Sequence, residues 1–197
     1  MTHRHRLLLL GALLLPLTTG SHAASDFYLR EQRVKAPEMG EILTYVLVAG
    51  GEEYAFVPPF EWRIGSEAER RRLVLTSRDR SASILVSLQP PNAALGKEAE
   101  PEALRRQVLA RFNGGRIMEE FACHTGSHNG RAFDVAWTGP GDVAMTSRLA
   151  FFATASGAIE FNLSTMAGRF RPSEKVLGSL LTSFQQRSGT GGTKPAS

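Results

Sequence analysis

The stretch RAFDVAWTGPGDVAMTSRLAFFATASGAIEFNLSTM, residues 131–166, decides the fold of this chain. Near its end Ile159, Phe161 and Leu163 alternate with polar residues, and a similar alternation occurs near its start. A period of two is typical of strands, because successive side chains point to opposite faces of a sheet. The links GPG and ASG are short and rich in turn residues, so the pattern predicts an antiparallel meander. With the segment 116–124 that precedes them across the link GSHNG, the expected strands of the meander are 116–124, 131–138, 143–153 and 158–166.

The middle of this meander is apolar on both faces. In the segment SRLAFFA the adjacent Phe151 and Phe152 must point to opposite sides of the sheet. A strand that is apolar on both sides is typical of a sheet that is covered on both faces. We therefore expect helices to pack on each side of the meander.

Strand patterns also precede the meander. Gly50 and Gly51 separate two segments rich in β-branched and aromatic residues, which predicts a two-residue hairpin turn. A second hairpin is expected around the polar turn SRDRSA. The expected strands before the meander are 42–48, 54–57, 72–76 and 83–88.

Two amphipathic helices complete the pattern. Leu104, Val108 and Phe112 recur at helical spacing after Pro101, and Asn-Gly-Gly at 113–115 ends this mid-chain helix. A second helix begins near the Pro-Ser pair at 172–173. Its core-facing stripe is Val176, Leu177, Leu180, Leu181 and Phe184.

These elements predict one α+β domain over residues 41–186, because no internal repeat or long linker divides the chain. The expected architecture is an α/β/α sandwich with a central antiparallel sheet, one helix mid-chain and one C-terminal helix. Residues 24–40 show little pattern and predict an irregular lead-in. The low-complexity residues 187–197 predict a disordered tail.

The first residues have the pattern of a cleavable export signal. Arg4 and Arg6 precede an apolar run from Leu7 to Leu17, which is too short to span a bilayer comfortably. The small residues of Ser21-His22-Ala23 predict cleavage after Ala23; an uncleaved membrane anchor is the alternative. The sequence thus predicts a signal peptide over 1–23 and a periplasmic or secreted protein without a transmembrane segment.

The composition is that of an ordinary globular domain, with 42% hydrophobic and 21% charged residues. Removal of the signal with its two arginines lowers the formal net charge from +4 to +2. The basic run ERRRLVLTSRDR, residues 69–80, is interspersed with acids. A nearly neutral mature chain disfavours nucleic acid as a partner, because nucleic-acid-binding domains are usually clearly basic.

The order of elements resembles the PsbP-like fold, an α/β/α sandwich. This fold is named for an extrinsic photosystem II protein and is shared with a Ran-binding nuclear import factor and bacterial exported proteins of unknown role. Two segments carry the resemblance. YAFVPPFEW, residues 54–62, is similar to the family's early Y-x-F-x-x-P strand, and FRPSEKVLGSLLTSFQ, residues 170–185, to its closing helix ending in Ser-Phe. The resemblance covers roughly residues 41–186 and implies the fold and a non-catalytic accessory or binding role.

The one dense cluster of reactive side chains is FACHTGSHNGRAF, which holds Cys123, His124 and His128. A thiol with two imidazoles could act as a nucleophile with its base or as part of a metal site. The spacing C-H-x3-H is not a usual zinc spacing. On a strand Cys123 would share a face with Ile117 and Phe121, while His124 would point away.

The residues after this cysteine predict a turn. Asn129 and Gly130 are a strong hairpin signal, which places His128 at a solvated tip. The sequence therefore favours a packed core cysteine with surface histidines over a catalytic or metal site, and it indicates no cofactor. No P-loop, nucleophile elbow, dinucleotide-binding glycine pattern or H-E-x-x-H motif is present.

These observations favour an exported protein that binds an envelope protein or a small ligand without catalysis. The alternative is a small hydrolase or a metal-dependent enzyme that uses Cys123, His124 and His128. The oligomeric state is left open.

Overall fold

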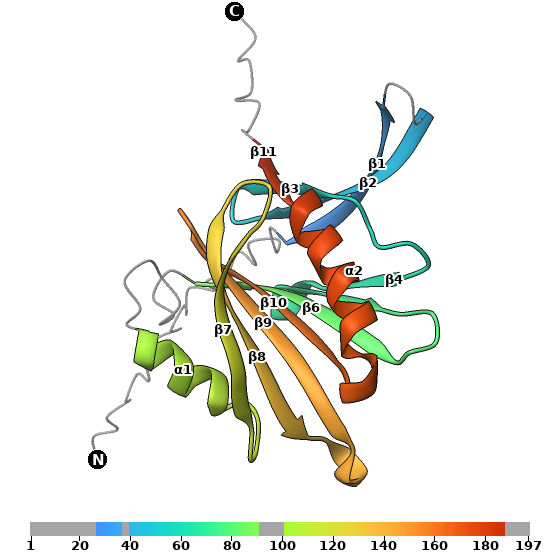
Figure 1. Ribbon diagram of the computed structural model, residues 1–197. Helices are drawn as coiled ribbons and strands as arrows, with labels where there is room; N and C mark the ends of the chain where they lie inside the picture. Colours follow the sequence, from blue (N-terminus) through green and yellow to red (C-terminus); the bar gives the residue numbers. More distant parts are fainter. Residues whose placement is uncertain (1–26, 37–39, 91–100, 188–197) are drawn as a thin grey trace, which may run out of the picture.

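The computed structural model describes residues 27–36, 40–90 and 101–187. Within these residues two antiparallel sheets and two α-helices are formed (Figure 1). The predicted signal 1–23 and all but the first residue of the predicted tail 187–197 lie outside the described residues.

The larger sheet has seven strands in the order β4-β5-β6-β10-β9-β8-β7. Its strands are β4 (Arg63–Glu67), β5 (Arg72–Thr76), β6 (Ala82–Gln89), β7 (Arg116–His124), β8 (Asn129–Thr138), β9 (Ala144–Thr154) and β10 (Gly157–Met166). Strands β7 to β10 form the predicted meander, with every neighbouring pair antiparallel. Short 3-10 turns are η1 (Ala68–Arg70), η2 (Pro140–Asp142) and η3 (Ala167–Arg169).

A second, four-stranded sheet has the order β1-β2-β3-β11. Its strands are β1 (Tyr28–Ala36), β2 (Gly40–Ala49), β3 (Glu52–Phe56) and β11 (Gln185–Arg187). The predicted glycine turn joins β2 to β3, and both Gly50 and Gly51 adopt a positive φ, at 62° and 78°. Two-residue turns whose twist matches that of the flanking strands require such positive φ angles, which glycine adopts readily.

The prediction of an irregular lead-in over 24–40 is wrong where the structure describes it. Residues Tyr28 to Ala36 form β1 and pair with β2 along its whole length. The segment YLREQRVKA has few apolar residues, so its strand character comes from pairing with β2 and not from an apolar pattern of its own.

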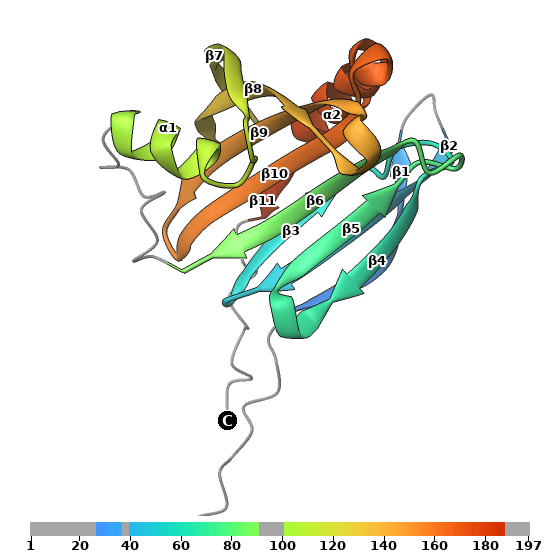
Figure 2. The same cartoon turned by 90° about the horizontal axis from the view of Figure 1, so that it is seen from below.

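The two helices cover opposite faces of the seven-stranded sheet. Helix α1 (Pro101–Leu109) packs Leu104 and Val108 against Phe133 and Phe151. Helix α2 (Phe170–Ser183) and the four-stranded sheet share the other face with Phe152 and Phe161. Figure 2 shows α1 over one end of the larger sheet and the smaller sheet behind β4–β6. The predicted α/β/α sandwich is thus confirmed, with the smaller sheet as an added component of the α2 layer.

The two segments that carry the family resemblance meet in the core. Tyr54 and Phe56 of β3 both stack on Phe184, with ring centroids 5.3 and 5.8 Å apart. The Ser183 hydroxyl accepts a hydrogen bond from the backbone N–H of Val57 at 3.2 Å. These motif residues therefore join the end of α2 to the smaller sheet, which is a packing role.

Within the described ranges, no helix is long and apolar enough to span a membrane.

Candidate functional site

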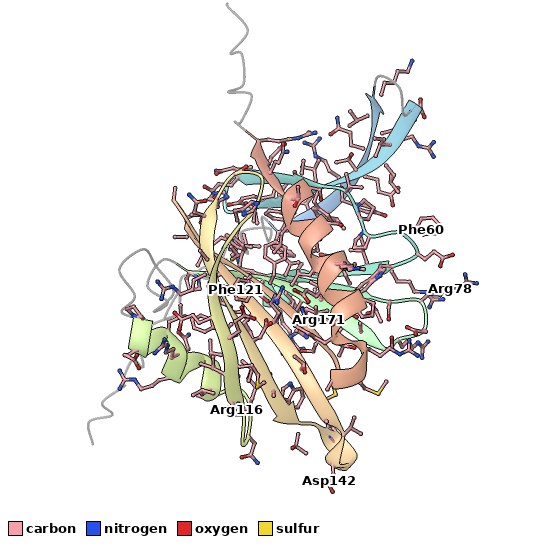
Figure 3. All side chains as sticks on the ribbon, in the orientation of Figure 1. Phe60, Arg78, Arg116, Phe121, Asp142 and Arg171 are labelled. Atoms are coloured by element: carbon pink, nitrogen blue, oxygen red, sulfur yellow. The ribbon has the colours of Figure 1, made fainter. Side chains whose placement is uncertain are left out.

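A cleft between β7 and α2 is the candidate site, and we call it the β7–α2 cleft. Its volume is about 240 Å³. Its lining residues are Phe121, Ala122, Cys123, His124, Ala132, Arg148, Ala150, Leu177, Gly178, Leu181 and Thr182. Figure 3 labels Phe121, on the side of β7 that faces α2. Two of the three predicted candidate residues, Cys123 and His124, therefore line one cavity.

A β-bulge determines which side chains of β7 face this cleft. The register with β8 shifts between Ile117 and Glu119, so Met118 is an extra residue. Ile117 consequently packs on the α1 side, whereas Phe121 and Cys123 pack on the α2 side. The expectation that Cys123 shares a face with Phe121 is confirmed. The inclusion of Ile117 is wrong, because the bulge reverses the alternation.

The hairpin turn that follows β7 differs from the prediction. Asn129 and Gly130 belong to β8, and the turn is formed by residues 125–128. The Thr125 hydroxyl accepts hydrogen bonds from the backbone N–H groups of Ser127 and His128, at 3.2 and 3.0 Å. A side chain that satisfies the turn backbone replaces the Asn-Gly turn chemistry that the sequence indicated.

The hairpin tip is also held by the end of α2. The Gly126 N–H donates to the carbonyl of Phe184 at 3.0 Å, and the Gln186 N–H donates to the Ser127 hydroxyl at 2.8 Å. These bonds connect the tip of the β7–β8 hairpin to the chain that leaves α2. Both walls of the cleft are therefore fixed relative to each other at this end.

The thiol of Cys123 is half-buried in the cleft wall. Burial raises its pKa to about 11, and the positive charge of Arg148 only partly opposes this effect. A catalytic cysteine needs the opposite change, because the thiolate is the nucleophile. Among the described residues, no hydrogen bond joins this thiol to His124 or His128.

The two histidines lie in different surroundings. His124 is exposed at the end of β7. His128 is half-buried, and its ring lies 6.4 Å from that of Tyr54, so the prediction of a solvated tip is wrong for this side chain. In the described part of the chain no group of three or more His, Cys, Asp or Glu side chains is arranged to hold a metal ion.

Arg148 is the charged residue of the cleft, and the sequence did not single it out. Its guanidinium donates two hydrogen bonds to Asp134, at 2.6 and 2.7 Å, and lies 3.0 Å from Glu174 of α2. It also stacks on Phe121 and Phe170, at 4.6 and 5.4 Å from their centroids. Two carboxylates and two rings thus surround this cation.

Gly178 is the second residue that sequence reasoning missed. It lies in the middle of α2 at the border of the cleft, and a Cβ added there would meet no atom within 4 Å. Its φ is not positive, so the backbone does not require glycine. A glycine inside a helix costs about 0.5–1 kcal/mol relative to alanine. That cost was a signal available in the sequence.

The two tryptophans pack against the hydrophobic core, and several charged residues of the basic run form ion pairs. The Trp137 ring packs against that of Phe112, with centroids 5.3 Å apart and planes tilted by 44°, and its Nε1–H donates to the Ser147 hydroxyl at 2.9 Å. Trp62 borders a shallow hollow beside Phe60, which is 89% exposed and labelled in Figure 3. In the basic run, Arg70 and Arg72 pair with Glu67, Arg78 pairs with Glu61, and Asp79 pairs with Arg169.

No family model and no curated protein matches this sequence. Several solved structures match the fold. LpqN, involved in cell envelope biogenesis of Mycobacterium tuberculosis, is 10% identical with a TM-score of 0.56, over 82% of this chain and 92% of its own. Cyanobacterial PsbP (CyanoP) from Synechocystis sp. PCC 6803 is 13% identical with a TM-score of 0.54, over 87% of this chain and 99% of its own.

The Ran-binding protein Mog1p of Saccharomyces cerevisiae matches less well. It is 11% identical with a TM-score of 0.49, over 80% of this chain and 96% of its own. The chain spans 46% of a further matched structure, from Bacteroides thetaiotaomicron. The likeness to LpqN and CyanoP, at identities this low, concerns the fold alone. The chain therefore has the PsbP-like fold, as the sequence resemblance implies.

Proposed function

We propose that this chain is an exported, non-catalytic binding protein whose ligand enters the β7–α2 cleft. The observation that carries the proposal is the cleft itself, a cavity of about 240 Å³ whose wall on α2 is left open by Gly178. Gly178 destabilises the helix and meets no steric or conformational need. Its presence is explained if a ligand occupies the space beside it.

The chemistry of the lining supports binding over catalysis. The Cys123 thiol has a raised pKa, and burial is the main cause, so the group is neutral near neutral pH. Arg148 pairs with Asp134 and Glu174, and its charge only partly offsets the effect of burial on the pKa of Cys123. The apolar residues that remain, such as Leu177 and Leu181, offer contact area and no reactive group.

The proposal of export rests on the signal pattern of residues 1–23. The description of LpqN as involved in cell envelope biogenesis agrees with an envelope setting for a chain of this fold.

The test of binding uses two glycines that both face open space. Gly178 borders the cleft, whereas Gly168 lies on η3 outside the cleft, and neither would place a Cβ within 4 Å of another atom. Immobilised wild-type chain is incubated with an extract of its native envelope, and retained small molecules are identified by mass spectrometry. We expect wild type and Gly168→Leu to retain a molecule that Gly178→Leu does not retain.

A further variant separates binding from catalysis. Cys123→Ala removes the thiol and keeps the strand. Wild type and this variant should therefore both retain the molecule in the same chemical form. Equal retention by all glycine variants, or retention of nothing by wild type, would contradict the proposed use of the cleft. Chemical conversion of the retained molecule by wild type and not by Cys123→Ala would contradict the non-catalytic role.

A further inference from the structure

We infer that the β7–α2 cleft binds the uncharged hydrocarbon group of a small molecule, an inference that rests on the proposed function. It names the chemical class of the ligand. The argument uses the charges around the cleft, the polar groups at its border, its size and Gly178.

The charges at the cleft cancel within the protein. Arg148 lies against Asp134 and Glu174, and Glu174 also lies 3.4 Å from Arg171, so two cations face two carboxylates. An anionic ligand would have to compete with Asp134 for the guanidinium. Burying a further carboxylate without a free partner is costly, so the cleft disfavours an anionic ligand.

Two of the polar side chains at the border of the cleft, Thr182 and Arg148, are also occupied. The Thr182 hydroxyl donates to the carbonyl of Gly178 at 3.0 Å. Arg148 donates to Asp134 through both Nε and one terminal nitrogen. A peptide brings backbone N–H and C=O groups that must be satisfied when they are buried, and these groups are not free to satisfy them. This favours a hydrocarbon group over a peptide segment.

The floor and walls of the cleft fit such a group. Ala132 and Ala150 form a floor of small side chains on β8 and β9, and Leu177 and Leu181 form the wall on α2. Pockets for drug-sized ligands usually measure about 300–1,000 Å³. A volume of about 240 Å³ is smaller, so the cleft accommodates part of a molecule, such as a ring or the end of a chain.

Gly178 contributes to the space that is available in the cleft. It stands one residue after the buried Leu177, on the exposed border of the cleft. Any larger side chain there would extend into open space beside the apolar lining. Leucine at this position should therefore occupy part of the volume that the hydrocarbon group would fill.

The test compares two probes with the same ring system and different charge. 1-Aminoanthracene is uncharged near neutral pH, and 2-anthracenecarboxylate is an anion of similar size. Binding to the full chain is measured by fluorescence titration. We expect the neutral probe to bind at least about tenfold more tightly than the anion, because the anion must be buried without a free cation.

Variants locate the bound probe. Gly178→Leu, which adds a side chain from α2, and Cys123→Met, which adds one from β7, should each weaken the neutral probe several-fold. Gly168→Leu, the matched control, should leave its affinity unchanged. Circular dichroism melts show that each variant is folded.

The outcomes distinguish this inference from the proposed function. If the anion binds as well as the neutral probe and Gly178→Leu blocks both, the cleft binds ligands and the inference about charge is overturned. If N-acetylphenylalanine amide binds more tightly than 1-aminoanthracene, the occupant is a protein side chain and the inference is also overturned. If neither probe binds the cleft, the inference fails while the extract experiment still decides the proposed function.

Discussion

At the scale of single residues, the surroundings of Cys123 decide what its thiol can do. The side chain lies on the α2 face of β7 beside apolar neighbours, and burial there raises its pKa to about 11. The neighbouring His124 belongs to the exposed end of the strand. A protonated thiol without an imidazole hydrogen bond is a packing residue at the cleft and a poor nucleophile.

This leads to a prediction about thiol reactivity. With a pKa about two units above the usual 9.0, the thiolate population at about pH 8 is on the order of 100-fold smaller than for an unperturbed cysteine. Alkylation by iodoacetamide should be slower in the folded chain by roughly this factor, and its rate should still be rising at pH values near the raised pKa. Mass spectrometry follows the reaction, with the chain unfolded in guanidinium as the control. Equal rates in the two states would contradict the environment described for Cys123.

Two glycines should respond to alanine in opposite directions. Gly178→Ala should stabilise the protein by about 0.5–1 kcal/mol, because the helix gains propensity and the new methyl meets open space. Gly130→Ala should destabilise it by about 1–3 kcal/mol, because the new methyl would collide with the Phe151 carbonyl and the Phe152 ring. Urea denaturation measures both changes. A loss of stability in Gly178→Ala would show that this glycine has a structural role.

At the scale of elements, α2 is joined to the larger sheet by one charged cluster. Arg148 on β9 connects Asp134 on β8 to Glu174 on α2, and the side chains of Arg148 and Asp134 are 13% and 9% exposed. The cluster closes the end of the cleft opposite the hairpin contacts of α2. The cluster orients α2 on the sheet, but its net contribution to stability is limited, because a buried ion pair also carries a desolvation cost.

A double-mutant cycle tests this connection. Arg148→Met leaves Asp134 buried and unpaired and should cost about 3–5 kcal/mol, whereas Asp134→Asn should cost less, because Arg148 keeps Glu174 as a partner. The double variant should recover much of this loss, because no uncompensated charge of the pair remains. Chemical denaturation measures all three.

The control for this cycle is the exposed pair Arg78–Glu61. Its side chains are 76% and 48% exposed, so Arg78→Met should change the free energy of unfolding by less than about 1 kcal/mol. Additive effects of Asp134→Asn and Arg148→Met would mean that the two residues do not act as a pair.

At the scale of the whole molecule, the two faces of the larger sheet differ. Helix α1 covers one face and contributes a small core with Phe133 and Phe151. The other face is covered by α2 and the smaller sheet, and it holds the larger core. The β7–α2 cleft lies on this second face, beside the edge strand β7, where the covering layer ends.

The prediction at this scale concerns the N-terminus. If residues 1–23 are a cleaved signal, the protein isolated from its native host should begin at Ala24 and carry two fewer positive charges. Intact-mass analysis and N-terminal sequencing of the envelope and extracellular fractions measure this. Ala23→Arg should block cleavage and leave a longer chain in the membrane fraction. A mature chain that still begins at Met1 would contradict the proposed export signal.

The sequence by itself determined the local elements. The alternation around Phe161, the twin glycines at 50 and 51 and the helical stripe ending at Phe184 each follow from the geometry of a few neighbouring residues. Their order then indicated the sandwich, and the placement of Phe151 and Phe152 on opposite faces followed from chain alternation alone. The same alternation predicted that Cys123 packs on the face of the strand that holds Phe121.

Only the tertiary structure decided what joins distant parts of the chain. Strand β1 exists because β2 pairs with it, and the extra residue Met118 reverses the alternation that local reasoning extended to Ile117. The pairing of Arg148 with Asp134 and Glu174, and the open space beside Gly178, depend on how α2 docks on the sheet. A periodic pattern reports which face a side chain takes, whereas contacts across the fold depend on register and docking, which no local pattern contains.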